Sequence, residues 1–363
     1  MKRIGWIDDL KGLGIVLIVL GHVVATVHIM STGLVAERVD AVFRYIYSFH
    51  VPFFFLLAGL TFTGKQSFGD FAKKKFLRLM VPYFIWGFVS ALLFIVMGRC
   101  VVANVGSAAY AGKAMNDAWW VPFVSILHGG RWPDGKGFSF NGVLWFLPVL
   151  FLCEIIYYWV AKWLKGTWRS VLLVSAIIAI LSPIYWPMIK LHLPYGLSWT
   201  IGYLAYMTVG HWIGEVFIRG EWAGEKKNLW QWLAVGMAIV VGWRLCGAMG
   251  EVVRYPKLFI YAFATILPLL LVARFGVFRL FAPFAPYTIG IMLFHKFIII
   301  PLQIVGNKLG VMHHCPGLMA VVCIITFTAT CLLVTYFTSK AIIRFAPWSL
   351  GAKGRYDSRV LGK

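Results

Sequence analysis

The feature that most constrains this chain is a series of long apolar blocks separated by short basic segments. Each block has about 17–25 residues, enough for an α-helix to cross about 30 Å of hydrocarbon. With 61% hydrophobic and 13% charged residues, the chain lacks the polar surface of an ordinary soluble domain. The sequence predicts an all-α polytopic membrane protein with about ten transmembrane helices. We place them at 12–31, 46–63, 77–97, 142–161, 170–189, 197–217, 229–248, 258–273, 286–305 and 317–339.

The net charge of +21 could indicate a nucleic-acid partner, but the placement of the charges argues against one. Lys and Arg lie between the apolar blocks, as the positive-inside rule requires of cytoplasmic loops. With a cytoplasmic N-terminus, the inner segments contain 22 of these residues and the outer segments 11. The bias predicts that both termini are cytoplasmic, that membrane lipids surround the chain, and that it does not bind nucleic acid.

The spans leave little chain outside the membrane. Residues 1–340 are interpreted as one transmembrane domain and 341–363 as a basic cytoplasmic tail. The longest outer loop, about 98–141, is rich in Trp. These rings are typical of membrane-interface anchors, and the alternative is a surface on which sugars stack. The membrane bundle itself must carry the function.

Ionisable side chains inside a bilayer are costly, so each is a functional candidate. Lys11 stands at the cytoplasmic boundary of the first span, and His22 lies inside that span eleven residues later. On one continuous helix this spacing places them on the same face with a rise of about 16 Å between them. A cation at the water edge can hold a phosphate group while an imidazole deeper in meets the reactive end of the same molecule. The alternative is a snorkelling lysine and a histidine that only packs.

Two further groups could serve a site on the cytoplasmic side. Lys75 and Arg78 belong to a basic cluster at the start of the third span, where they could bind cofactor phosphates or only set topology. Glu154, in the fourth span, could orient His22 through a carboxylate–imidazole hydrogen bond, or be protonated and structural. We also expect Asp8 to pair with Lys11, because residues three apart are neighbours on a helix. The same rule makes His211 and Glu215 a helix-stabilising pair.

The acceptor side has three candidates. His50 is expected at the outer start of the second span, and His295 lies in the ninth span beside Lys296. Trp145 lies near the start of the fourth span. The contiguous His313-His314-Cys315 run lacks the ligand spacing of a closed zinc site, so we expect no metal.

Five phrases in register resemble membrane acyltransferase family 3, which includes the sugar O-acetyltransferases of bacterial envelopes. They are Leu10-Lys11-Gly12 with Gly21-His22, the stretch 48–59, the basic run 73–78 leading to Val81-Pro82-Tyr83, Leu144-Trp145-Phe146-Leu147, and the stretch 288–295. Lys11 replaces the arginine typical of the family, which keeps the charge but loses the bidentate fork. Ala58 stands where serine is common, and Met292 where tyrosine is common.

The resemblance implies that His22 is catalytic and that an acyl group, expected to be acetyl from acetyl-coenzyme A, moves to a hydroxyl of a cell-surface glycan or its lipid-linked precursor. It also implies a bacterial cytoplasmic membrane. A histidine suits this chemistry because its ordinary pKa is near neutral, and an acyl-histidine intermediate is a second route. The rival hypothesis is a proton-coupled transporter, which would use the same buried His and Glu but usually shows an internal repeat that we do not find. A non-catalytic flippase-like or scaffold protein is a third hypothesis.

Overall fold

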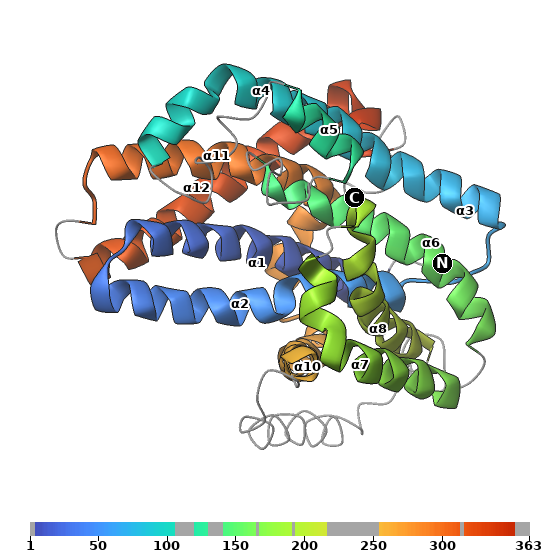
Figure 1. Ribbon diagram of the computed structural model, residues 1–363. Coiled ribbons are helices and arrows are strands. Elements are labelled where there is room, and N and C mark those ends of the chain that lie inside the picture. The colour runs from blue at the N-terminus through green and yellow to red at the C-terminus, as the bar shows by residue number, and fades with distance from the viewer. Residues whose placement is uncertain are drawn as a thin grey trace.

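The computed structural model describes residues 4–105, 120–129, 141–164, 167–190, 193–215, 254–312 and 316–352 (Figure 1). Its long helices are α1 (Gly5–Met30), α2 (Gly33–Leu60), α4 (Val81–Val105), α6 (Phe146–Trp163), α7 (Thr167–Lys190), α8 (Leu197–Gly214), α10 (Arg254–Ala273), α11 (Thr288–Lys308) and α12 (Pro316–Phe345). Each of these helices overlaps a predicted span. The remaining predicted span, 229–248, lies outside the described residues. Six helical stretches in the described ranges are long and apolar enough to cross a membrane. The all-helical membrane fold is therefore confirmed, whereas the cytoplasmic position of the termini stays a prediction.

The second helix is longer than predicted. It begins at Gly33 rather than near residue 46 and forms an antiparallel pair with α1 (Figure 1). Its first half contains charged, exposed side chains, among them Arg44, which pairs with Asp40 one turn earlier. Such i, i+4 pairs stabilise a helix without any apolar block. Hydropathy alone therefore placed the start of this helix too late.

A π-helical turn, η1 (Phe76–Met80), joins the short helix α3 (Phe68–Lys75) to α4. Ser67 caps α3, because its hydroxyl accepts a hydrogen bond from the Asp70 N–H at 3.2 Å. Pro82 follows the π turn and has no N–H to donate to the Arg78 carbonyl, so a regular α-helix cannot continue here. A π turn changes which side chains face the bundle and is frequent at functional sites. Lys75 immediately precedes this turn, and Arg78 lies in its middle.

Glycines bring α2 and α8 into close contact. A Cβ added at Gly59 would lie 2.0 Å from the Met207 carbonyl oxygen, and one at Gly210 would lie 2.1 Å from that of Leu56. Small residues at crossings of this kind let transmembrane helices approach backbone to backbone. The contact fixes α8 beside α2, and therefore near the part of α2 that carries His50.

The end of the described chain returns to the π turn. After α12, the short 3₁₀ helix η10 (Pro347–Leu350) packs against α4, and the Trp86 indole N–H donates to the Ser349 carbonyl at 3.0 Å. Gly351 has φ +66°, and a Cβ there would lie 2.5 Å from the Arg78 carbonyl oxygen. Position 351 thus requires glycine for two reasons, its positive φ and the close approach of the Arg78 carbonyl. A second 3₁₀ helix, η9 (Arg279–Tyr287), packs against α1 and leads into α11.

Candidate functional site

One face of α1 lines two neighbouring cavities. Lys11, Ile15 and Ile18 line one of them, and Ile18 and His22 line the other. The spacing of these four residues, i, i+4, i+7 and i+11, is that of a single helix face. Lys11 and His22 therefore lie on the same face of α1, as predicted.

The histidine cavity, defined as the cavity lined by His22, has a volume of about 310 Å³. Two of the predicted acceptor-side residues, His50 and Trp145, also line it. Aromatic side chains form much of its wall: Tyr47, Trp145, Phe146, Trp199, Tyr203 and Tyr206. The Trp145 and Trp199 rings meet edge to face, with centroids 4.4 Å apart. The cavity thus presents flat apolar faces together with imidazole nitrogens.

The middle cavity, of about 150 Å³, lies next to it and contains all three predicted cofactor residues, Lys11, Lys75 and Arg78, together with Glu154. Three buried side chains, Ile18, Phe146 and Met292, line both cavities and therefore separate them. We call these three the constriction. A thin, extended part of a ligand that passed through the constriction would reach His22 from the middle cavity.

The basic cavity, of about 930 Å³, adjoins the middle cavity in turn. Its lining includes Lys73, Lys74 and Arg78, and the Arg78 side chain is exposed. Four residues line both this cavity and the middle one: Arg78, Ala285, Thr288 and Ile289. The three cavities form a row, from a wide basic mouth to a small aromatic chamber that contains His22.

His22 is hydrogen-bonded to a tyrosine on α2. The Tyr47 hydroxyl lies 2.7 Å from His22 Nδ1, and the two rings meet edge to face. The ring centroids of His50 and His295 lie 6.4 and 5.0 Å from that of His22. His50 is not at an outer helix start, as the sequence suggested, but buried in the interior of α2. His295 is fully buried behind His22 and is not among the residues that line the histidine cavity.

The two neighbouring histidines have their Nδ1 atoms against backbone carbonyls. His50 Nδ1 lies 2.8 Å from the Ile46 oxygen, and His295 Nδ1 lies 3.1 Å from the Ile291 oxygen. A carbonyl only accepts, so both Nδ1 atoms carry a hydrogen and both Nε2 atoms of the neutral rings carry a lone pair. His22 differs from them because its Nδ1 meets a hydroxyl, which can donate or accept.

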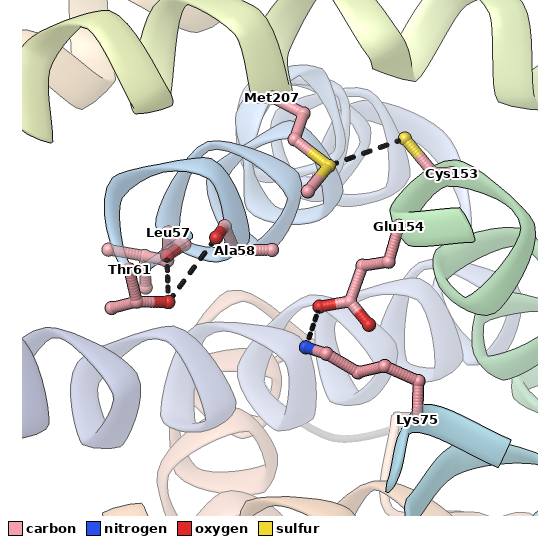
Figure 2. A network of polar contacts seen from close by, with 7 residues as sticks. All are labelled: Leu57, Ala58, Thr61, Lys75, Cys153, Glu154 and Met207. Carbon is pink, nitrogen blue, oxygen red and sulfur yellow. Dashed lines mark hydrogen bonds and ion pairs between the residues drawn. The ribbon is translucent and has the colours of Figure 1, made fainter. Parts of the chain in front are cut away.

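Glu154 is paired with Lys75 rather than with His22 (Figure 2). The expected carboxylate–imidazole hydrogen bond is therefore wrong: the Glu154 Oε1 accepts from the Lys75 ammonium group, and Tyr47 occupies His22 Nδ1. Glu154 is only 4% exposed, and within the described ranges its Oε2 has no hydrogen-bond partner. Lys75 ends α3, and both α3 and the π turn that follows it pack against α6, which places Lys75 beside Glu154. Thr61, drawn in the same view, lines the middle cavity as well.

Two predicted helix pairs are confirmed. Asp8 lies 3.5 Å from Lys11, and His211 Nε2 lies 3.3 Å from Glu215. His211 also meets the Tyr157 hydroxyl through Nδ1 at 2.9 Å, away from the three cavities. The His313-His314-Cys315 run lies outside the described residues, as does most of the outer Trp-rich loop.

Sequence reasoning missed Tyr47 and most of the aromatic wall. Tyr47 lies three residues before His50, so it shares the helix face that the sequence had already marked, and that spacing could have identified it. Trp199, Tyr203 and Tyr206 recur at helical spacing near the start of α8, but nothing in their pattern indicates which helix they face.

Comparison with known proteins gives one match. The sequence profile of a family described as "Acyltransferase domain", acyltransferase family 3, matches residues 4–337. No curated protein matches the chain, and no solved structure does either. The match covers nearly the whole chain, including α1, the π turn and all residues that line the histidine and middle cavities, and it favours an enzyme over a transporter. The chain belongs to acyltransferase family 3 and is a membrane acyltransferase.

Proposed function

We propose that this acyltransferase moves an acyl group, acetyl in the simplest case, from acyl-coenzyme A to a hydroxyl of a cell-surface glycan or its lipid-linked precursor. Coenzyme A would enter at the basic cavity, its phosphates held by Arg78 with Lys75 and Lys11 deeper along the path. Its pantetheine arm contains amide N–H groups, and Glu154 Oε2 is an acceptor open to them. The thioester would then lie beyond the constriction, next to His22.

His22 acts as the general base in this proposal. An acceptor hydroxyl is a poor nucleophile until its proton is removed during attack, and imidazole suits that transfer. The hydroxyl oxygen bonds to the thioester carbonyl carbon while its proton passes to His22. The tetrahedral intermediate then collapses, the carbon–sulfur bond breaks, and the departing coenzyme A sulfur receives that proton. His22 thus returns to its neutral form at the end of each cycle.

The row of three adjoining cavities is the observation that supports this proposal most strongly. A coenzyme A molecule has a bulky anionic head and a thin arm, which matches a wide basic mouth followed by a narrow path. The aromatic wall of the histidine cavity supports a sugar acceptor, because the apolar C–H faces of a pyranose pack on indole and phenol rings. The outer Trp-rich loop could extend that surface.

The orientation follows from the charges. With the basic cavity facing the cytoplasm, where coenzyme A thioesters are available, the histidine cavity lies toward the opposite leaflet. Lys73 and Lys74 then obey the positive-inside rule. We place the enzyme in the bacterial cytoplasmic membrane, surrounded by lipid, with a glycan or glycolipid as its second substrate.

The direct test mixes purified protein in nanodiscs with radiolabelled acetyl-coenzyme A and glycan acceptors. We expect labelled sugar and free thiol in equal amounts. If a panel of lipid-linked and free glycans yields neither product while coenzyme A binds, the glycan assignment fails. If coenzyme A itself does not bind, the donor assignment fails.

Arg78→Ala should weaken coenzyme A binding about 10- to 100-fold, because a hydrogen bond to a charged group contributes about 1.5–3 kcal/mol. Isothermal titration of the protein in nanodiscs measures the effect. Arg44→Ala is the matched control, since Arg44 is an exposed arginine on α2 that pairs with Asp40 and lines none of the three cavities. Equal affinities in the Arg78 variant and the wild type would remove Arg78 from the donor site.

Ile18→Trp should block the constriction. The indole would fill the space between the middle and histidine cavities, so transfer should fall about 100-fold or more, as it does when reactants are held apart. Coenzyme A affinity should change less than about twofold, since the phosphates bind elsewhere.

The matched control is Ile29→Trp, the same substitution at an exposed position of α1. We expect it to turn over at the wild-type rate. Wild-type turnover by the Ile18 variant would mean that the donor arm does not pass between Ile18, Phe146 and Met292.

A further inference from the structure

The hydrogen bond between His22 and Tyr47 has two orientations, and they have opposite consequences. In a neutral imidazole one nitrogen carries hydrogen and the other a lone pair. If Tyr47 donates to Nδ1, the hydrogen of His22 is on Nε2, and that nitrogen cannot take a proton. If Tyr47 accepts from Nδ1–H, Nε2 has the lone pair that a general base needs.

We propose that Tyr47 is a positioning residue that accepts a hydrogen bond from His22 Nδ1–H and thereby holds His22 in the tautomer that is basic at Nε2. The inference rests on the proposed role of His22 as base. It assigns to a phenol on α2 the task that a carboxylate performs in many hydrolases, where loss of the correct tautomer costs about 10⁴-fold in rate.

The surroundings of Tyr47 favour the accepting orientation. A tyrosine that accepts from His22 must direct its own hydrogen elsewhere, and the His50 ring lies with its centroid 4.6 Å from that of Tyr47. Because His50 Nδ1–H is directed to the Ile46 carbonyl, His50 Nε2 carries a lone pair on that ring. A second hydrogen-bond acceptor, other than the His22 ring, is therefore present beside Tyr47.

The position of the bond also fits a positioning role. His50 and His295 are fixed by the carbonyl four residues earlier on their own helices, whereas Tyr47 reaches His22 from another helix. A cross-helix bond locks the ring relative to the cavity wall. The ring of Tyr47 packs on Phe43, with centroids 4.1 Å apart, and it lines the histidine cavity with His22.

Tyr47→Phe removes the hydroxyl and keeps the ring. We expect kcat to fall about 10- to 100-fold, less than the loss of a full triad carboxylate because a phenol is a weaker acceptor. The KM for acetyl-coenzyme A should stay within about twofold of wild type, since Tyr47 does not line the middle or basic cavity.

Tyr157→Phe is a matched control. It breaks the same kind of bond, a tyrosine hydroxyl to a histidine Nδ1 at 2.9 Å, but at His211, outside the three cavities. We expect its kcat to match that of wild type. If the two variants lose kcat equally, the effect is general destabilisation and the proposal is overturned; an unchanged kcat in Tyr47→Phe overturns it too.

A spectroscopic measurement tests the tautomer without any loss of folding. The ¹⁵N NMR spectrum of histidine-labelled wild-type protein, with His22 assigned by comparison with His22→Gln, distinguishes protonated Nδ1 from protonated Nε2. We expect hydrogen on Nδ1 in the wild type and a shift toward the other tautomer in Tyr47→Phe. Hydrogen on Nε2 in the wild type would overturn the proposal. The kcat comparison requires a wild-type enzyme that transfers acetyl, and the NMR measurement uses the protein without substrates. A negative result in either is therefore distinguishable from a wild-type protein that transfers no acetyl group.

Discussion

His22→Ala should reduce kcat for acyl transfer about 10²- to 10⁴-fold, the range that a positioned general base contributes. Among the α1 residues that line the histidine and middle cavities, His22 is the one with an imidazole. After its removal, no other side chain on that face of α1 can act as the base. Coenzyme A affinity should remain close to wild type, because the phosphate-binding residues lie beyond the constriction. Steady-state assays with labelled acetyl-coenzyme A and titration of coenzyme A measure the two effects separately.

His28→Gln is the control for this prediction. His28 belongs to the same helix, but its Nδ1 lies 3.0 Å from the Ala36 carbonyl, near the connection to α2. It lines none of the three cavities, so its substitution should leave kcat unchanged. Both variants should elute as folded protein in size-exclusion chromatography. Full activity in well-folded His22→Ala would refute the assignment of the base.

The part of the site that depends on one helix was predictable. Helical periodicity alone places Lys11 and His22 on the same face, and the structure has that face along two adjoining cavities. The hydrophobic block that begins at residue 12 also predicts that Lys11 lies at the membrane boundary and His22 near the middle of the membrane. The fold class followed from the same blocks, because only helices with internally satisfied backbones have this pattern in a bilayer.

The part that depends on contacts between helices was not predictable. One of two interpretations of the sequence paired Glu154 with His22, whereas Glu154 meets Lys75, 79 positions earlier. That pairing depends on how α3 and the following π turn pack against α6, which regular periodicity along one span does not anticipate. The aromatic wall was missed for the same reason, since the position of Trp199 and Tyr203 follows from the glycine-mediated crossing of α2 and α8. A hydropathy profile shows neither the packing of the π turn nor this helix crossing.

Glu154→Leu should reduce the free energy of unfolding by about 3 kcal/mol, the lower part of the range for breaking a buried ion pair. Glu154 is 4% exposed and the Lys75 side chain is 21% exposed, so the substitution leaves a largely buried ammonium group without its carboxylate. The double variant Lys75→Met with Glu154→Leu should regain most of this loss, because apolar side chains of similar volume replace such pairs at little cost. Denaturant unfolding in detergent micelles measures both values.

The pair of Arg44 and Asp40 on α2, in which the arginine side chain is 74% exposed, provides the control cycle. Asp40→Leu should cost less than about 1 kcal/mol, as is usual for surface ion pairs. The stable double variant then separates two roles of the Lys75–Glu154 pair, folding and donor binding, that no single variant can separate. If the pair serves folding alone, coenzyme A binds the double variant as it binds the wild type. Since we propose that Lys75 also holds the donor in the middle cavity, we expect coenzyme A affinity to fall about tenfold or more in a protein that remains folded. Wild-type affinity in that variant would assign the pair to folding alone and leave donor binding to Arg78 and Lys11.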